Sequence, residues 1–132
     1  MELLTLIRSG ETFQSFGKEG CRGIVLFGDQ YLHTLERGDG YKWLRPGVYT
    51  LEIAKMNRGK TPALRVLGDY SRGRIYLHAA TRPGHLKGCV AVGLSTTRWG
   101  LRHPRPAMAL LFDFLGGFRV GEECRLVVKG EI

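Results

Sequence analysis

The sequence of 132 residues has few cysteines, no long apolar run and no signal-peptide pattern. Its three cysteines, Cys21, Cys89 and Cys124, include no C-x-x-C pair, so neither a disulfide framework nor a zinc knuckle is expected. The longest apolar stretches fall far short of the roughly 18 residues that a membrane span needs. Because the N-terminus lacks a basic start followed by an apolar run, we expect synthesis and folding in the cytoplasm.

Acidic residues are absent between Asp69 and Asp113, and this absence gives the sequence its clearest charge pattern. The stretch carries seven cations and three of the four histidines: Arg72, Arg74, Arg82, Lys87, Arg98, Arg102, Arg105, His78, His85 and His103. Over the whole chain, 20 basic and 12 acidic residues leave a net charge of +8. The excess favours anionic partners such as carboxylates or phosphates, although a solvated basic face without a partner has the same pattern.

Nineteen glycines spread along the chain indicate many short strands joined by tight turns. We predict one mainly β domain over residues 1–132, with an antiparallel or mixed sheet and one short C-terminal helix. The helix is expected over Pro106–Leu115, and Ser95–Arg105 is expected to be a surface excursion or lid. The predicted strands are Leu3–Arg8, Thr12–Phe16, Gly23–Phe27, Tyr31–Glu36, Val48–Ala54, Ala63–Leu67, Arg74–Ala79, Gly88–Val92 and Cys124–Lys129.

The run from Ser71 to Gly93 has the residues that best suit chemistry. Alternation along a strand there directs Ile75 and Leu77 to the core, and directs Arg74, Tyr76 and His78 to the opposite face. The turn at Pro83-Gly84 allows Gly88–Val92 to return beside that strand. With Val90 and Val92 buried, Cys89 and Ala91 face the other side, so we expect His78 and Cys89 to meet.

A nucleophilic cysteine needs a base, a positive environment that favours the thiolate, and donors for the developing oxyanion. His78 supplies the base, and Lys87, Arg74 and Arg82 supply positive charge. Gly88 lets a carbonyl approach closely, and the amides around it supply donors. The alternative is an inert buried cysteine, with His78 hydrogen-bonded to the backbone.

The remaining candidates indicate no cofactor. Glu36 either orients His78, binds a basic partner or pairs with an arginine. His85 assists Cys89 from its loop or is simply solvated. His33 and His103 are isolated, no His, Asp and Glu cluster has metal-ligand spacing, and no Walker loop is present.

Several motifs of the sequence resemble those of two known families. His78 and Cys89, separated by ten residues, with the cysteine in Gly88-Cys89-Val90, resemble a shortened L,D-transpeptidase (YkuD-type) signature. More closely, residues 3–128 resemble a small family of phage and bacterial domains of unknown function. The matching motifs are Arg8 with Thr12 and Gly17, Thr34-Leu35-Glu36, Pro46-Gly47-Val48-Tyr49, Arg74-Ile75-Tyr76-Leu77-His78, and Gly88-Cys89-Val90-Ala91-Val92-Gly93.

The resemblance implies a sheet similar to that of the L,D-transpeptidases, with Cys89 as nucleophile and His78 as base. It also implies an acyl-enzyme formed on a peptidoglycan stem peptide and transferred to an amine or to water, as in an L,D-transpeptidase, an L,D-peptidase or a phage lysis factor. The residues expected to bind the substrate are Arg74, Arg82, Lys87, Tyr76 and Glu36. The chain departs from the transpeptidase pattern at Lys87 and Ala91, which stand where that pattern has histidine and arginine.

The alternative is a protein without enzymatic activity that uses its basic field to bind an anion. Its ligand would be a nucleotide, a nucleic acid or a glycan, in host takeover or in a virion. Nucleic acid is a partner only in this alternative. If the chain is encoded by a phage, we expect it in the host cell or in the virion.

Overall fold

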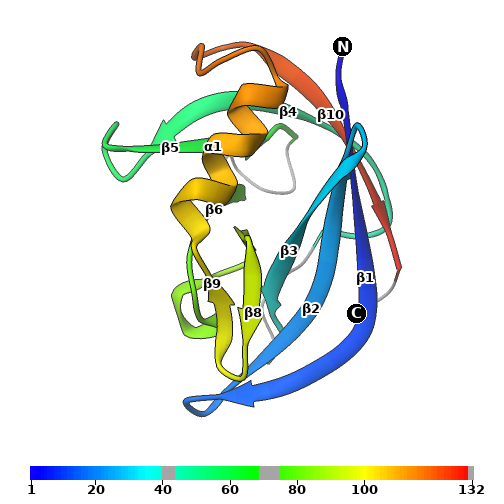
Figure 1. Ribbon diagram of the computed structural model, residues 1–132, viewed down its shortest axis with the longest axis vertical. Helices are drawn as coiled ribbons and strands as arrows, with labels where there is room; N and C mark the ends of the chain where they lie inside the picture. Colours follow the sequence, from blue (N-terminus) through cyan, green and yellow to red (C-terminus); the bar gives the residue numbers. More distant parts are fainter. Residues whose placement is uncertain (40–43, 69–74, 131–132) are drawn as a thin grey trace.

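The computed structural model describes residues 1–39, 44–68 and 75–130. In these residues, eight strands close a barrel in the order β1-β10-β4-β5-β6-β7-β3-β2, and two more strands form a separate hairpin (Figure 1). Neighbouring barrel strands are antiparallel except for the pairs β1–β10 and β6–β7, which are parallel. The prediction of a mixed, mainly β fold with one short helix is confirmed.

The first three strands form a meander along one side of the barrel: β1 (Leu3–Ser15), β2 (Lys18–Phe27) and β3 (Gln30–Arg37). β1 is one long strand, although the sequence predicted two. The pairing register with β2 shifts between Arg8 and Thr12, and Gly10 has a φ of 79° within that interval. The predicted break is therefore a bulge, which bends the strand without ending its pairing.

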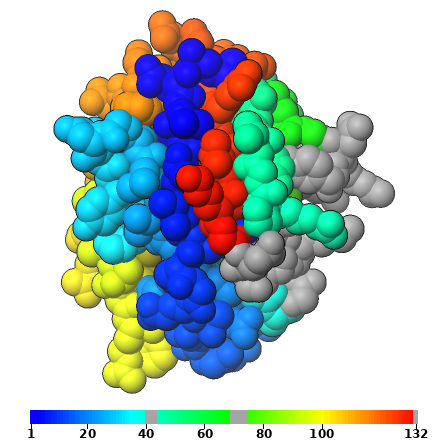
Figure 2. Space-filling view, turned by 90° about the vertical axis from the view of Figure 1, so that its right-hand side faces the viewer, coloured from blue at the N-terminus to red at the C-terminus, as the bar shows by residue number. Residues whose placement is uncertain are grey.

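The barrel closes where the last strand lies beside the first. β10 (Glu123–Lys129) runs parallel to β1 and antiparallel to β4 (Gly47–Met56), which in turn pairs with β5 (Thr61–Val66). Figure 2 shows the red C-terminal strand beside the blue N-terminal one. Cys124, Leu126 and Val128 alternate as the buried residues of β10, which agrees with a strand that has one face in a core.

Two short parallel strands complete the ring: β6 (Tyr76–Ala79) and β7 (Val90–Gly93). A parallel pair needs a crossover, and residues 80–89 make it through a 3-10 turn, η2 (Pro83–His85). This segment is the loop that was predicted from Pro83-Gly84. The segment covers part of the outer surface of the barrel, and its residue Leu86 is fully buried there.

The segment Ser95–Arg105, predicted as a surface excursion or lid, contains a hairpin that the sequence did not predict. Its strands are β8 (Ser95–Thr97) and β9 (Gly100–Arg102). The helix α1 (Pro104–Phe114) follows directly, two residues earlier than the predicted Pro106 start. Two prolines fit the first helical turn because neither has an N–H that needs a partner there.

The apolar core has two parts, one inside the barrel and one outside it. The inner cluster joins strand residues to the buried face of α1, which consists of Ala107, Met108, Leu111 and Phe112. The outer cluster is smaller and lies between β3, β6, β7, the crossover and β9. Its buried members are Leu35, Leu86, Cys89, Ala91 and Leu101.

Candidate functional site

Cys89 and His78 lie on the same outer face of the barrel. In the parallel β6–β7 pair, His78 is opposite Ala91 and Leu77 is opposite Val90. Leu77 and Val90 belong to the inner cluster, whereas Cys89 belongs to the outer one. The face assignment predicted from alternation is therefore confirmed for the described residues.

Both side chains line one cleft of about 720 Å³. One wall is the β4–β5 hairpin, with Met56, Asn57 and Thr61; a second is the crossover after β6. The third wall is the start of α1, at Pro104 and Arg105. His78 on β6 and Cys89, directly before β7, therefore line one space that extends to the surface of the protein.

The backbone determines which nitrogen of His78 carries a proton. Its Nδ1 atom lies 3.1 Å from the carbonyl oxygen of Ala79. A carbonyl oxygen only accepts hydrogen bonds, so Nδ1 of the neutral ring is the protonated nitrogen and Nε2 has the free lone pair. Burial lowers the pKa of His78 below 6.5, and the bond to Ala79 opposes this only in part. At neutral pH the ring is an uncharged base.

Cys89 is a thiol rather than a thiolate at neutral pH. It is 8% exposed, and burial raises its pKa above 9.0, while a hydrogen bond with the backbone of Tyr76 acts in the opposite direction. The sequence led us to expect that nearby cations favour the thiolate. For the free protein this expectation is wrong, because the loss of hydration around sulfur is the largest influence on the pKa.

Gly88 precedes the cysteine with a φ of 96°, a region that residues with a side chain rarely adopt. The backbone direction into Cys89 therefore depends on this glycine. Cys89 is followed directly by β7, so its position is determined from both sides. Any residue other than glycine at position 88 would strain the turn that places the sulfur in the cleft.

The predicted substrate-binding residues are only partly gathered at the cleft. Lys87 lines it and is exposed. Arg82 is exposed too, but its guanidinium lies 4.1 Å from the ring centre of Phe16, away from the lining residues. Tyr76 is half-buried and packs against the outer cluster. Arg74 lies outside the described residues.

Glu36 does not line the cleft. Its carboxylate accepts two hydrogen bonds from Arg8 and is only 3% exposed, so it follows the arginine-pairing alternative. The substrate-binding role assigned to Glu36 is therefore wrong for this arrangement, because both oxygens already have a partner inside the protein. No sequence periodicity links positions 8 and 36, which meet only through the meander.

Two further lining residues of the cleft are exposed: His85 on η2, predicted either to assist Cys89 or to be solvated, and Arg105 on α1, which was not among the predicted site residues. None of the described residues that line the cleft is acidic. The absence of acids from 70–112 is the signal that pointed to this environment. The sequence did not show that the start of α1 and the crossover line the same cleft.

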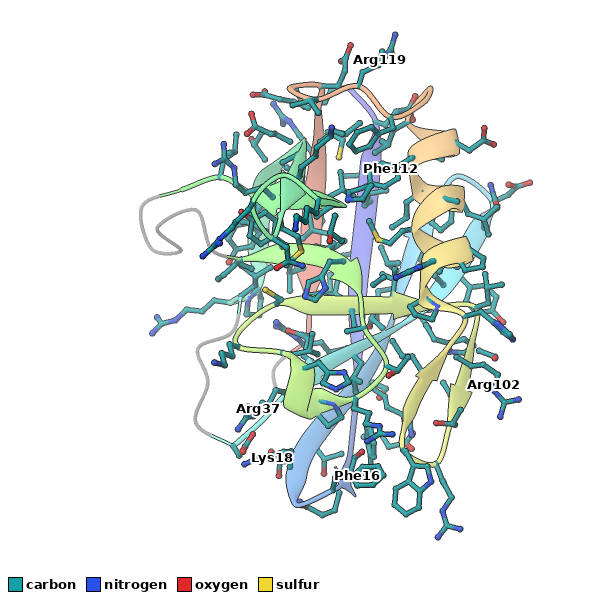
Figure 3. The ribbon with its side chains drawn as sticks, turned by 90° about the vertical axis from the view of Figure 1, so that its left-hand side faces the viewer. Phe16, Lys18, Arg37, Arg102, Phe112 and Arg119 are labelled. Atoms are coloured by element: carbon teal, nitrogen blue, oxygen red, sulfur yellow. The ribbon has the colours of Figure 1, made fainter. Side chains whose placement is uncertain are left out.

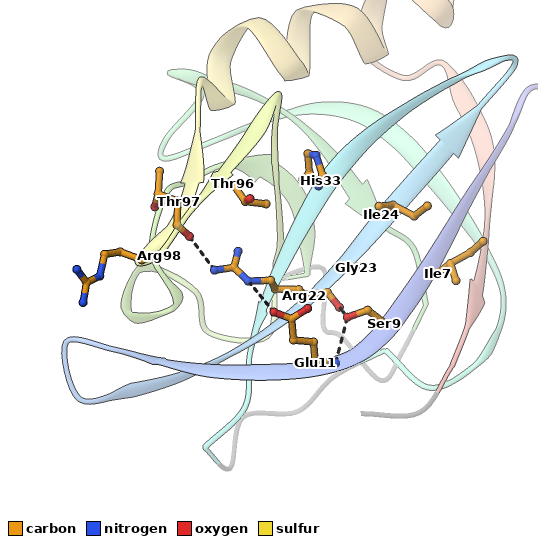
Figure 4. Close-up of a pocket in the computed structure, with 10 residues that line it drawn as sticks. All are labelled: Ile7, Ser9, Glu11, Arg22, Gly23, Ile24, His33, Thr96, Thr97 and Arg98. Carbon is orange, nitrogen blue, oxygen red and sulfur yellow. Dashed lines mark hydrogen bonds and ion pairs between the residues drawn. The ribbon is translucent and has the colours of Figure 1, made fainter.

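A second cleft, of about 660 Å³, lies between the β8–β9 hairpin and strands β1, β2 and β3 (Figure 4). Arg22 occupies it, and donates to the carbonyl oxygens of Thr97 at 2.7 Å and Gly100 at 3.1 Å. Its guanidinium also lies 3.7 Å from a carboxylate oxygen of Glu11. None of the predicted site residues lines this cleft, and Arg22 uses its donors to anchor the hairpin.

Metal chemistry has no visible site in the part of the chain that the structure describes, where no three His, Cys, Asp or Glu side chains gather. In the same residues no helix is long and apolar enough to cross a bilayer.

Comparisons with protein-family models, with curated proteins and with solved structures give no match. The resemblance to the L,D-transpeptidases and to the phage and bacterial domain family stays a prediction.

Proposed function

We propose that this protein is a cysteine acyltransferase or peptidase that acts on peptidoglycan stem peptides, of L,D-transpeptidase or L,D-peptidase type. One observation carries the proposal: a neutral His78 on β6 and Cys89, directly before the adjacent strand β7, line the same cleft. Support for a carboxylate-bearing substrate comes from the lining cations Lys87 and Arg105 and from the lack of acidic lining residues among those described.

The chemistry begins from an uncharged pair. As the Cys89 sulfur attacks the carbonyl carbon of the substrate amide, its proton passes to Nε2 of His78. The imidazolium then gives this proton to the leaving amine as the C–N bond breaks, which leaves a thioester on Cys89. An amine or a water molecule attacks the thioester, its proton passes to His78, and the thiol is regenerated. Every proton that leaves a nucleophile returns to a leaving group.

The pKa values of the two groups decide how the nucleophile is activated. A buried thiol beside a neutral ring does not form a stable ion pair before substrate arrives. The thiolate is generated only as the bond to carbon forms. The free enzyme is therefore expected to react slowly with simple alkylating agents, although it acts on its own substrate.

The test uses purified stem tetrapeptides and pentapeptides, incubated with the protein and read by mass spectrometry for loss or exchange of the terminal D-alanine. We expect product with the wild type and none with Cys89→Ala or His78→Gln. Cys21→Ala, which removes a buried thiol that does not line the cleft, is the matched control and is expected to keep activity. Activity that survives in Cys89→Ala would overturn the proposal, as would a folded wild type that yields no product.

Anion binding without catalysis is the second candidate, and the exposed Lys87 and Arg105 favour it. It predicts salt-dependent association with a phosphate-bearing ligand that Cys89→Ser leaves unchanged and Lys87→Gln weakens. Titration with a nucleotide and with an oligonucleotide at low salt tests this alternative. No association with either ligand would rule it out.

A further inference from the structure

Two hairpin turns meet at one end of the molecule and present aromatic rings to solvent. Phe16 lies in the β1–β2 turn and Trp99 in the β8–β9 turn, and their ring centres are 5.2 Å apart. The two side chains are 61% and 44% exposed, respectively. Both turns lie at the lower end in Figure 1, and Figure 3 labels Phe16 there. We call Phe16, Trp99, Arg82 and Arg98 the aromatic tip.

The stability of the β1–β2 turn does not explain why a phenylalanine stands at position 16. Phe16 and Gly17 both have positive φ angles, 51° and 79°. A two-residue hairpin turn of this kind favours Asn or Asp at its first position, because a larger side chain is strained there. The turn thus holds a large apolar side chain, mostly exposed, in a conformation that disfavours it.

The aromatic tip is held in place by polar contacts behind it. The Ser15 hydroxyl donates to the Trp99 carbonyl oxygen at 2.7 Å, which joins the two turns. Arg22 donates to the carbonyl oxygens of Thr97 and Gly100, on either side of the tip of the second hairpin. The rings are therefore presented by a preformed surface, so binding orders few additional groups.

The aromatic tip is also positively charged. The Arg82 guanidinium lies 4.1 Å from the ring centre of Phe16, and that of Arg98 lies 4.6 Å from the ring centre of Trp99. Neither guanidinium has a carboxylate partner in residues 1–39, 44–68 and 75–130. A protruding surface with exposed aromatic rings and unneutralised cations complements an anionic partner that also has an apolar layer.

The arrangement of the rings favours a lipid surface over bases or sugars. A base or a sugar stacks on an open ring face. Here a guanidinium covers one face of each ring, and the rings contact each other at an interplanar angle of 47°. Ring edges can enter the interfacial layer of a bilayer while the guanidinium groups pair with phosphates, which is how Trp and Arg distribute at membrane interfaces.

We propose that the aromatic tip docks this protein onto a bilayer of anionic phospholipids, by inserting Phe16 and Trp99 and pairing Arg82 and Arg98 with headgroup phosphates. The proposal does not rest on the function of the Cys89 cleft. It concerns attachment to a membrane surface and adds no membrane-spanning element.

Co-sedimentation with vesicles tests the proposal. The full chain is mixed with vesicles of equimolar phosphatidylglycerol and phosphatidylcholine, or of phosphatidylcholine alone, at low and at high salt. We expect it to sediment with the anionic vesicles at low salt, and much less with neutral vesicles or at high salt. Failure to sediment with the anionic vesicles, or equal sedimentation with both vesicle types, would overturn the proposal.

Phe16→Asn is the most informative variant, because it gives the turn its preferred residue and removes the ring. We expect binding to anionic vesicles to weaken about tenfold or more, with the thermal midpoint unchanged or raised. The control is Tyr31→Thr, which removes an exposed ring at the start of β3, at the opposite end of the barrel (Figure 1). Phe16→Asn binding as tightly as wild type would contradict the assignment.

Tryptophan fluorescence locates the contact. In a Trp43→Phe background, emission reports Trp99 alone, and we expect a shift to shorter wavelength on adding the anionic vesicles. The same protein is titrated with a thymidine oligonucleotide. A response to the oligonucleotide together with no response to vesicles would overturn the lipid proposal in favour of a nucleic-acid partner.

Discussion

Arg8 of β1 and Glu36 of β3 form a two-point ion pair inside the protein. The Nε atom of Arg8 donates to one carboxylate oxygen at 2.9 Å, and Nη2 donates to the other at 2.8 Å. Arg8 also donates to the carbonyl oxygens of Leu44 and Gly130. Since β2 lies between β1 and β3 in the barrel, this ion pair joins two strands that do not pair directly with each other.

Removing one partner of this pair is expected to be strongly destabilising. Arg8→Met leaves the Glu36 carboxylate buried without its donor, and we expect it to lower the free energy of unfolding by about 3 to 5 kcal/mol. The double variant Arg8→Met with Glu36→Leu removes both charges and is expected to lose far less. Urea unfolding of the single and double variants measures the difference. A single variant that loses only about 1 kcal/mol would show that the pair is solvated.

Alkylation of Cys89 should be slow at neutral pH and accelerate with pH. Because burial raises the pKa of the thiol above 9.0, the thiolate fraction, and with it the rate, should rise about tenfold per pH unit between pH 7 and 9. Iodoacetamide labelling followed by peptide mass spectrometry measures each cysteine separately. Cys21 and Cys124 serve as internal controls within the same protein. If the alkylation rate of Cys89 does not rise with pH above pH 7, the cysteine is already a thiolate there, which would contradict an uncharged pair of Cys89 and His78.

Stability should fall at alkaline pH, in part because of Cys124. Burial raises its pKa from 9.0 to about 11, so between these values the unfolded chain has lost the thiol proton that the folded protein keeps. Fewer protons bound in the unfolded state mean that the free energy of unfolding decreases as pH rises. We expect this decrease between pH 9 and 11 to be shallower in Cys124→Ala than in wild type, as measured by urea unfolding. Parallel curves would contradict the assignment.

Gly100 should tolerate a side chain much less well than Gly59. A Cβ at Gly100 would overlap the carbonyl oxygen of Thr81, whereas a Cβ at Gly59 meets nothing within 4 Å. The Thr81 oxygen also accepts the amide of Leu101 at 2.9 Å, so it cannot move freely. We expect Gly59→Ala to lose about 1 kcal/mol from its φ of +80° alone, and Gly100→Ala to lose clearly more. Thermal unfolding of the two variants decides this, and equal losses would contradict the crowding at Gly100.

The sequence predicted the local features of the fold and the facing of the two central residues. Alternation in β6 and β7 indicated that Leu77 and Val90 turn inward while His78 and Cys89 turn outward, and the structure confirms this. Period-two alternation is a local property, so it can be read along the chain. The β8–β9 hairpin was missed because its two strands have only three residues each, too few for any period to be visible.

The partners of those residues came only from the tertiary structure. Alternation shows which face is apolar but not which strands lie side by side, so neither the pairing of β1 with β10 nor that of Arg8 with Glu36 was visible in the sequence. Whether Arg105 lines the same cleft as Cys89 depends in the same way on how α1 packs. Burial also determined the pKa directions of Cys89 and His78, because hydration of a charge depends on everything that surrounds it in space.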